Sequence, residues 1–183
     1  SLFYTQLFHF LLDDDLYKKN SLPVYCLLDE FAHLSIPHFS SIITTTRARR
    51  VSLSIVLQSL SQLEERYGKH GANTILNGGC ASQVFFSGMD TDTARMLRET
   101  LGEVSVETLL VNGQFRRDKE PLMTTAAIRS MADNEVIYLY GNKRPMKLQL
   151  TPYYEQNDLL RRTQTAYRPP KIAPLSAVCY VPI

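Results

Sequence analysis

The chain has 183 residues, of which 44% are hydrophobic and 21% charged, a composition typical of one globular domain with a sizeable core. The net charge of +2 is too small to indicate nucleic-acid binding, and no apolar run approaches the roughly 18–20 residues that cross a bilayer. The cysteines, Cys26, Cys80 and Cys179, are few and far apart. Their spacing argues against a zinc site or a disulfide framework and favours a reducing, cytosolic setting.

Helices and strands alternate in the first third of the chain. Apolar side chains at helical spacing predict an amphipathic helix over residues 3–19. The continuous apolar run 22–28 predicts a strand buried on both faces, as in a parallel sheet. Pro37 opens a second predicted helix that ends near Arg49, and residues 51–57 predict a second strand.

The middle of the chain continues this alternation. Ser59 and Gln62 have capping-box spacing, and Gly102 stands where a helix C-terminus favours a left-handed residue. The predicted elements here are helices over residues 59–67, 72–76 and 90–101, and a strand over residues 82–86.

A hairpin is predicted in the last third, because Asn112-Gly113 is a strong turn signal between residues 108–111 and 114–116. A helix over residues 124–131 and strands over residues 135–140 and 145–150 are predicted to follow.

The order of these elements indicates an α/β fold with a mostly parallel sheet and helices on both faces. We expect this domain to cover residues 1–155, followed by a polar tail, residues 156–183. In such sheets, ligand sites form at the carboxyl ends of the strands.

Three polar side chains follow predicted strands at that edge. Asp29 and Glu30 come directly after the first strand, and Gln58 comes after the second. A carboxylate here can hold Mg²⁺ through water, a second can orient or deprotonate a water, and an amide can sense a γ-phosphate. The alternative is that all three are solvated turn residues.

Arg47, Arg49 and Arg50 end the helix that precedes the second strand. One interpretation is that these cations only stabilise the negative C-terminal end of that helix. The other is that one of them reaches across a subunit boundary to the phosphates bound by a neighbouring subunit. The phosphate-binding loop G-x-x-x-x-G-K-[S/T] does not occur in the sequence, so we expect the isolated chain to hydrolyse little nucleotide.

An ordered series of segments resembles the TraG/TraD-type coupling proteins of conjugative type IV secretion. Residues 27–32 resemble that family's Walker B segment. The later segments are residues 47–50, 55–63, 67–68, 75–77, 88–90, 93–94, 101–103, 121–129 and 153–155. The resemblance covers residues 1–155.

The resemblance implies the C-terminal part of a RecA-like P-loop NTPase domain, from Walker B onward and without the Walker A half. It gives Asp29 a Mg²⁺-coordinating role and Glu30 a water-activating role. It makes Gln58 a sensor residue and Arg47 a trans-acting arginine. The implied cofactors are ATP and Mg²⁺.

The resemblance implies that the chain is part of the ATP-hydrolysing motor that links relaxosome DNA to the secretion channel. The implied partners are the relaxase and other relaxosome proteins, DNA bound without sequence specificity, the secretion channel and further copies in a homo-hexamer. The family's membrane anchor places it at the cytoplasmic face of the bacterial inner membrane. Both the anchor and Walker A lie upstream of Walker B, so we expect this chain to be a soluble cytoplasmic piece.

Two other functions fit the residues. One is a non-catalytic module that docks relaxosome proteins, with residues 156–183 as a candidate contact. The other is a fragment of a related ring DNA translocase. For DNA, the candidate contacts are loops at Lys69-His70 and at Arg116-Arg117 with Lys119, unless these are merely solvated.

Overall fold

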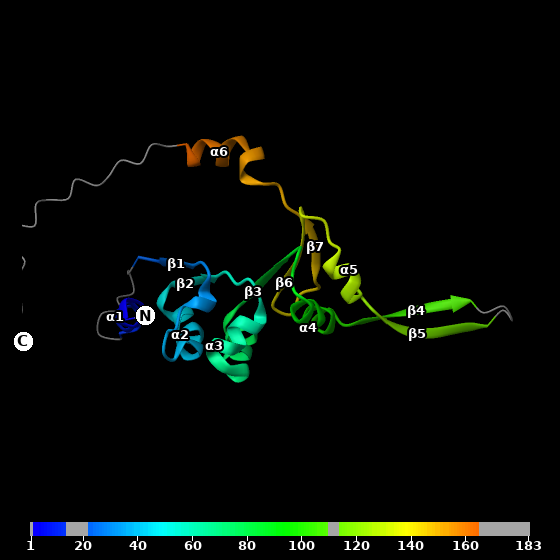
Figure 1. The fold of residues 1–183 in the computed structure, drawn as a ribbon, viewed down its shortest axis with the longest axis horizontal. Coiled ribbons are helices and arrows are strands. Elements are labelled where there is room, and N and C mark those ends of the chain that lie inside the picture. The colour runs from blue at the N-terminus through cyan, green and yellow to red at the C-terminus, as the bar shows by residue number, and fades with distance from the viewer. Residues whose placement is uncertain (1, 14–21, 110–113, 165–183) are drawn as a thin grey trace, which may run out of the picture. The chain divides into compact units, whose positions relative to one another are not determined.

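The structure, a computed structural model, describes residues 2–13, 22–109 and 114–164. It divides into two compact units, Ser1–Gln149 and Leu150–Ile183. All the described strands lie in the first unit, and they form three small sheets (Figure 1).

The first sheet is a parallel pair. Strand β1 (Val24–Leu28) lies beside β2 (Val51–Ile55). One face of β1 packs on the core, whereas the other leaves Tyr25 and Leu27 73% and 80% exposed. The strand predicted over residues 22–28 is therefore shorter than expected and buried on one face only.

The first hydrophobic core lies between this pair and three helices, α1 (Leu2–Leu12), α2 (Phe39–Thr45) and α3 (Leu60–Asn73). Its aromatic centre is a stack of Phe31 on Tyr67, with ring centroids 5.3 Å apart. The Tyr67 hydroxyl donates to the Leu34 carbonyl at 2.8 Å and accepts from the Ile36 N–H at 3.3 Å. The stack and these hydrogen bonds tie α3 to the segment after β1.

Two helix predictions change at their ends. The expected break between the helices predicted over residues 59–67 and 72–76 is present, because α3 contains two helical segments that meet at Gly68, whose backbone is non-helical (φ 69°, ψ 161°). The second segment begins earlier than expected. A π-helical turn, Thr74–Gly79, follows. Helix α1 ends at Leu12, and residues 14–21 lie outside the described part of the chain.

The second sheet is antiparallel. It has β6 (Glu135–Tyr140) between β3 (Ser82–Phe86) and β7 (Met146–Gln149). The second core joins this sheet to two helices, α4 (Thr91–Leu101) and α5 (Thr125–Arg129). It consists of Ala94, Leu97, Ile128, Met131 and Ile137.

The fold is mixed α/β, as expected, but the expectation of a mostly parallel sheet is wrong for the described strands. Only β1 and β2 pair in parallel among them. A short turn joins β6 to β7, and a connection of that length joins only antiparallel strands. The alternation of helices and strands does not encode which strands pair.

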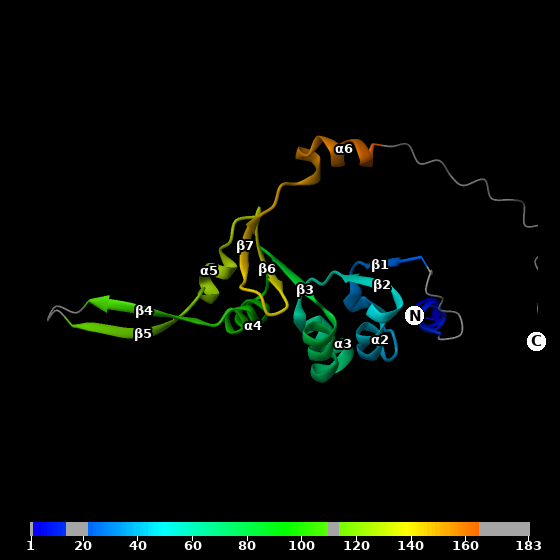
Figure 2. The same ribbon diagram turned by 180° about the vertical axis from the view of Figure 1, so that it is seen from behind.

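The third sheet is a ribbon of two antiparallel strands, β4 (Glu103–Leu109) and β5 (Phe115–Pro121), which lie side by side in both views (Figures 1 and 2). The predicted hairpin is confirmed, with longer strands than expected. Its predicted turn, Asn112-Gly113, lies outside the described residues.

The second unit contains a short 3₁₀ helix, Tyr153–Glu155, and helix α6 (Asn157–Thr163). Residues 165–183, most of the predicted polar tail, lie outside the described part of the chain. Within the described residues, no helix has both the length and the apolar character needed to cross a bilayer.

Candidate functional site

The parallel pairing of β1 and β2 brings three of the predicted site residues to one edge. Leu28 lies opposite Ile55, so both strands end at the same level. Asp29 and Glu30 continue from β1, and Gln58 lies in the loop after β2. All three side chains are exposed at this carboxyl edge.

The loop after β2 is hydrogen-bonded to the turn after β1. The Val56 N–H donates to the Leu28 carbonyl at 2.9 Å, and the Phe31 N–H donates to the Val56 carbonyl at 3.0 Å. The backbone before Gln58 is therefore fixed against the backbone on both sides of the two acids.

Glu30 has a left-handed backbone (φ 49°, ψ 42°), which is uncommon outside glycine and costs about 1–3 kcal/mol. The Asp29 carboxylate accepts the Glu30 N–H through Oδ1 at 2.9 Å. Phe31, fully buried, anchors the next turn. The two exposed acids are thus held in place by backbone hydrogen bonds and by the buried side chain of Phe31.

The start of helix α3 holds the other side of the Gln58 loop. Ser59 is the N-cap, and its side chain accepts the Gln62 N–H at 3.4 Å, which confirms the predicted cap. The Leu60 N–H donates to the Thr93 hydroxyl of α4 at 3.4 Å.

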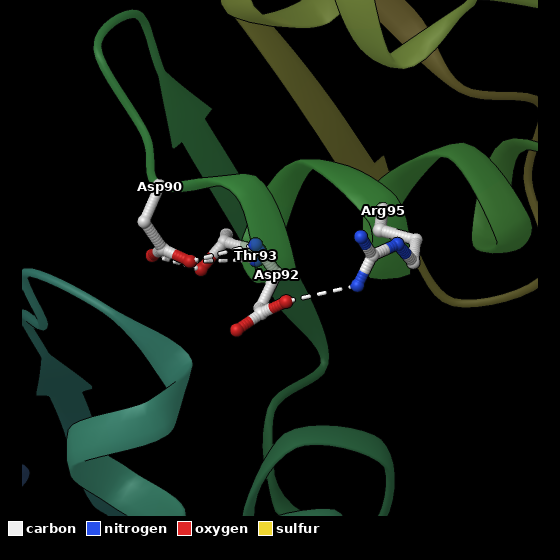
Figure 3. A network of polar contacts seen from close by, with 4 residues as sticks. All are labelled: Asp90, Asp92, Thr93 and Arg95. Carbon is white, nitrogen blue, oxygen red and sulfur yellow. Dashed lines mark hydrogen bonds and ion pairs between the residues drawn. The ribbon is translucent and has the colours of Figure 1, made fainter.

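Asp90 and Thr93 form a polar network at the start of α4 (Figure 3). The Asp90 carboxylate accepts from the N–H groups of Asp92 and Thr93 and from the Thr93 hydroxyl. Partial burial raises the pKa of Asp90, but these hydrogen bonds together hold it below its ordinary value. The sequence predicts a helix that starts at residue 90, but it does not signal the contact of Thr93 with Leu60.

Arg47 is not brought to this edge. It lies in the 3₁₀ helix Thr46–Arg49, which leads into the start of β2. The hydrogen bond from the Val24 N–H to the Arg50 carbonyl marks that opposite end of the strand pair. The exposed Arg47 is therefore separated from Asp29 by the length of the strands.

Metal-binding capacity at the edge is limited. In the described ranges, no group of three or more His, Cys, Asp or Glu residues could hold a metal ion. Cys26 and Cys80 are free thiols whose pKa is raised by burial, so they favour the neutral form. Asp29 and Glu30 are thus a pair of exposed carboxylates and do not belong to a larger cluster of protein ligands in the described residues.

The basic segments expected to be DNA-contacting loops lie in regular elements instead. Lys69 belongs to helix α3. On β5, Arg117 pairs with Glu107 at 2.6 Å and Arg116 pairs with Asp118 at 2.8 Å. These carboxylates balance the two arginine charges and weaken the field that would attract phosphates.

Comparison with known families shows to which family the chain belongs. Residues 23–133 match the family described as the TraM recognition site of TraD and TraG. The chain belongs to the TraG/TraD family. The matched TraG/TraD segment contains the whole edge formed by Asp29, Glu30 and Gln58.

One curated relative is the protein VirD4 of Rhizobium radiobacter, which is 27% identical over 149 residues and is matched by 75% of this chain. The chain spans only 22% of that relative. This TraG/TraD family segment therefore corresponds to about a fifth of the VirD4 protein.

Solved structures of the bacterial conjugative coupling protein TrwB share the fold. The unbound monoclinic form, TrwBdeltaN70, has a TM-score of 0.63 at 26% identity, covering 75% of this chain and 33% of that chain. The complex with the non-hydrolysable ATP analogue ADPNP has a TM-score of 0.66 at 25% identity, covering 81% and 35%. The complex with ADP and Mg²⁺ has a TM-score of 0.62 at 26% identity, covering 77% and 33%.

Proposed function

We propose that this chain is part of the ATP-hydrolysing motor of a conjugative coupling protein, which links relaxosome DNA to a secretion channel. The supporting observation is the convergence of Asp29, Glu30 and Gln58 at the carboxyl edge of the parallel pair β1–β2. TrwB, similar in fold and sequence, binds an ATP analogue and ADP with Mg²⁺. DNA, the secretion channel and the inner membrane enter the proposal through the family resemblance.

The roles follow from position. Glu30 orients and deprotonates the attacking water, and Gln58 senses the γ-phosphate through its amide. Asp29 suits a Mg²⁺ ion held through water, because one of its oxygens already accepts the Glu30 N–H and no cluster of protein ligands surrounds it in the described residues. When bound, Mg²⁺ neutralises charge on the phosphates.

Arg47 belongs in this proposal as a residue that acts across a subunit boundary. Its place at the opposite end of the strand pair keeps it from the edge of its own subunit. In a ring such as the proposed homo-hexamer, one subunit's far end meets its neighbour's edge, where a guanidinium stabilises charge developing on the phosphates.

The RecA-like architecture is also proposed for the longer protein. Among the described strands, β2 pairs only with β1 and β3 only with β6, so each has an unpaired edge. The apolar face with Tyr25 and Leu27 is open to solvent. Further strands and helices of a longer chain would pair with these edges and cover this face, giving one larger sheet.

The principal test is Glu30→Gln in the full-length coupling protein, with Glu99→Gln on the exposed surface of α4 as the matched control. Loss of the general base is expected to lower DNA-stimulated ATP turnover roughly 100-fold or more, with the control unchanged. Turnover unchanged by Glu30→Gln would remove the catalytic assignment.

Subunit mixing tests Arg47. Arg47→Ala and Glu30→Gln proteins are each expected to be nearly inactive. Rings mixed from both regain turnover, because some interfaces then pair an intact Glu30 with an intact Arg47. Mixed rings that stay inactive would contradict a role across the boundary.

The family description favours a second candidate function, the docking of relaxosome proteins. The matched region, residues 23–133, ends before the tail 156–183. Capture of purified relaxosome components by the chain with and without residues 156–183 separates the two possible surfaces. Binding that survives the deletion assigns docking to the matched region, and binding that is lost assigns it to the tail.

A further inference from the structure

Thr93 connects the loop that carries Gln58 to the start of helix α4. Its side chain is only 7% exposed. Its hydroxyl accepts the Leu60 N–H at 3.4 Å. The same hydroxyl donates to Asp90 Oδ2 at 2.6 Å, a hydrogen bond drawn as a dashed line in Figure 3. Leu60 begins α3, two positions after Gln58.

This contact replaces a hydrogen bond that the helix itself cannot supply. The first N–H groups of a helix have no partner within it, and the Ser59 side chain accepts from Gln62 rather than from Leu60. Thr93, 33 positions away in the sequence, takes the Leu60 N–H. Asp90 in turn fixes the direction of the Thr93 hydroxyl.

The Gln58 loop is therefore held at two ends. Before Gln58, Val56 is bonded to the backbone on both sides of the acidic turn. After Gln58, Leu60 is bonded to α4. A displacement of Gln58 strains one attachment or the other.

We infer that Thr93 is a positioning residue for Gln58, with Asp90 orienting its hydroxyl. This inference rests on the proposed function, in which Gln58 contacts the γ-phosphate or the attacking water. Loss of the Thr93 hydroxyl lets Gln58 leave its productive position without removing any proposed contact to the nucleotide. The chemical step is slowed, whereas nucleotide affinity is retained.

The test uses the full-length coupling protein carrying this chain. Thr93→Val keeps the shape and removes the hydroxyl, and is expected to lower kcat for ATP roughly tenfold while KM stays within about twofold. Thr93→Ser restores the hydroxyl and is expected to restore kcat. Thr91→Val is the matched control, because Thr91 is an exposed residue two positions away on the same helix.

A second variant removes the donor instead of the acceptor. Leu60→Pro deletes the N–H at the first helical position, where proline is tolerated, and Ser59 (φ −152°, ψ 157°) suits the residue before proline. It is expected to lower kcat like Thr93→Val, and the double variant is expected to lose no more than either single one. Should Thr93→Val fail to fold, Leu60→Pro and Thr93→Ser carry the test.

The outcomes distinguish a failure of this inference from a failure of the proposed function. Normal kcat in Thr93→Val or in Leu60→Pro, with turnover abolished by Glu30→Gln, overturns the positioning role and leaves the proposed function standing. Additive losses in the double variant, or no rescue by serine, also overturn it. Turnover unaffected by Glu30→Gln overturns the proposed function and the inference with it.

Discussion

Glu30 combines an exposed carboxylate with a left-handed backbone, and its neighbours keep it there. The next residue, Phe31, is buried against Tyr67 and donates its N–H to Val56. The cost of the Glu30 conformation is offset by this packing. The position of the proposed catalytic acid is thus set by aromatic side chains that pack in the first hydrophobic core.

Tyr67→Phe tests this support. The change keeps the ring stack but leaves the Leu34 carbonyl and the Ile36 N–H without the hydroxyl. We expect a loss of about 1–3 kcal/mol in the free energy of unfolding, measured by chemical denaturation of the 183-residue chain. Tyr153→Phe, on an exposed tyrosine of the second unit, is the control. An equal effect of both changes would contradict the role of the hydroxyl.

Asp90 predicts a pH dependence at the same scale. Its hydrogen bonds lower its pKa below the ordinary 3.8, so the unfolded chain binds the proton more tightly than the folded one. The stabilisation is therefore fully present above the unfolded pKa and is lost as pH falls through the lower, folded pKa. Between about pH 6 and about pH 3, the free energy of unfolding is expected to fall less in Asp90→Asn than in the parent chain, as measured by denaturation at each pH. Parallel curves would disprove this contribution.

Local signals in the sequence define most of the elements. Residue type and spacing predict three helix N-caps to within one residue. The observed caps are Ser59, Asp90 and Thr124, whose side chains accept N–H groups only two or three positions ahead. The strand over residues 82–86 has the predicted bounds for a similar reason, since β-forming residues fill it between turn signals.

The parts that could not be predicted are contacts between distant residues. The antiparallel return of β6 beside β3 depends on pairing across about fifty residues of chain, which periodicity does not record. The bond from Leu60 to Thr93 is of the same kind. For the site, the sequence predicted that Asp29, Glu30 and Gln58 converge if the two strands before them are parallel neighbours, and β1 and β2 do pair in parallel. Their catalytic roles stay predictions.

The π-helical turn after α3 provides a test at the scale of an element. A Cβ at Gly79 would lie 2.6 Å from the side chain of Ile43 on α2, closer than real contacts, whereas at Gly78 the nearest atom is 3.7 Å away. Gly79→Ala is therefore expected to lower the free energy of unfolding by about 1–3 kcal/mol, measured by thermal or chemical denaturation. Gly78→Ala is the matched control, and equal losses in both would show that α2 does not approach the turn this closely.

At the scale of the larger unit, the residues fall into two separate cores. One joins β1 and β2 to α1, α2 and α3, and the other joins β3 and β6 to α4 and α5. Each sheet keeps apolar residues on an open face, among them Leu27 and Phe86. This pattern is expected of a segment that corresponds to a third of the solved TrwBdeltaN70 chain.

Leu27→Asp tests whether the open face of β1 is covered in the longer protein. In the 183-residue chain Leu27 is 80% exposed, so a change of less than about 1 kcal/mol in unfolding free energy is expected. In the full-length coupling protein, the same change would bury a charge and is expected to cost about 3 kcal/mol or more. Denaturation curves shifted equally in the two proteins would contradict the proposed larger sheet.

The ribbon β4–β5 also affects the tendency of the protein to aggregate at high concentration. Among the described strands, β4 and β5 pair only with each other and leave both outer edges of the ribbon unpaired, and such edges can seed aggregation between copies. Here β5 carries the consecutive charged residues Arg116, Arg117, Asp118, Lys119 and Glu120. A second strand that paired with that edge would bring its own side chains beside these charges, and charged residues on an edge strand disfavour such pairing. The run of charged residues on β5 therefore disfavours self-association of the ribbon through this edge.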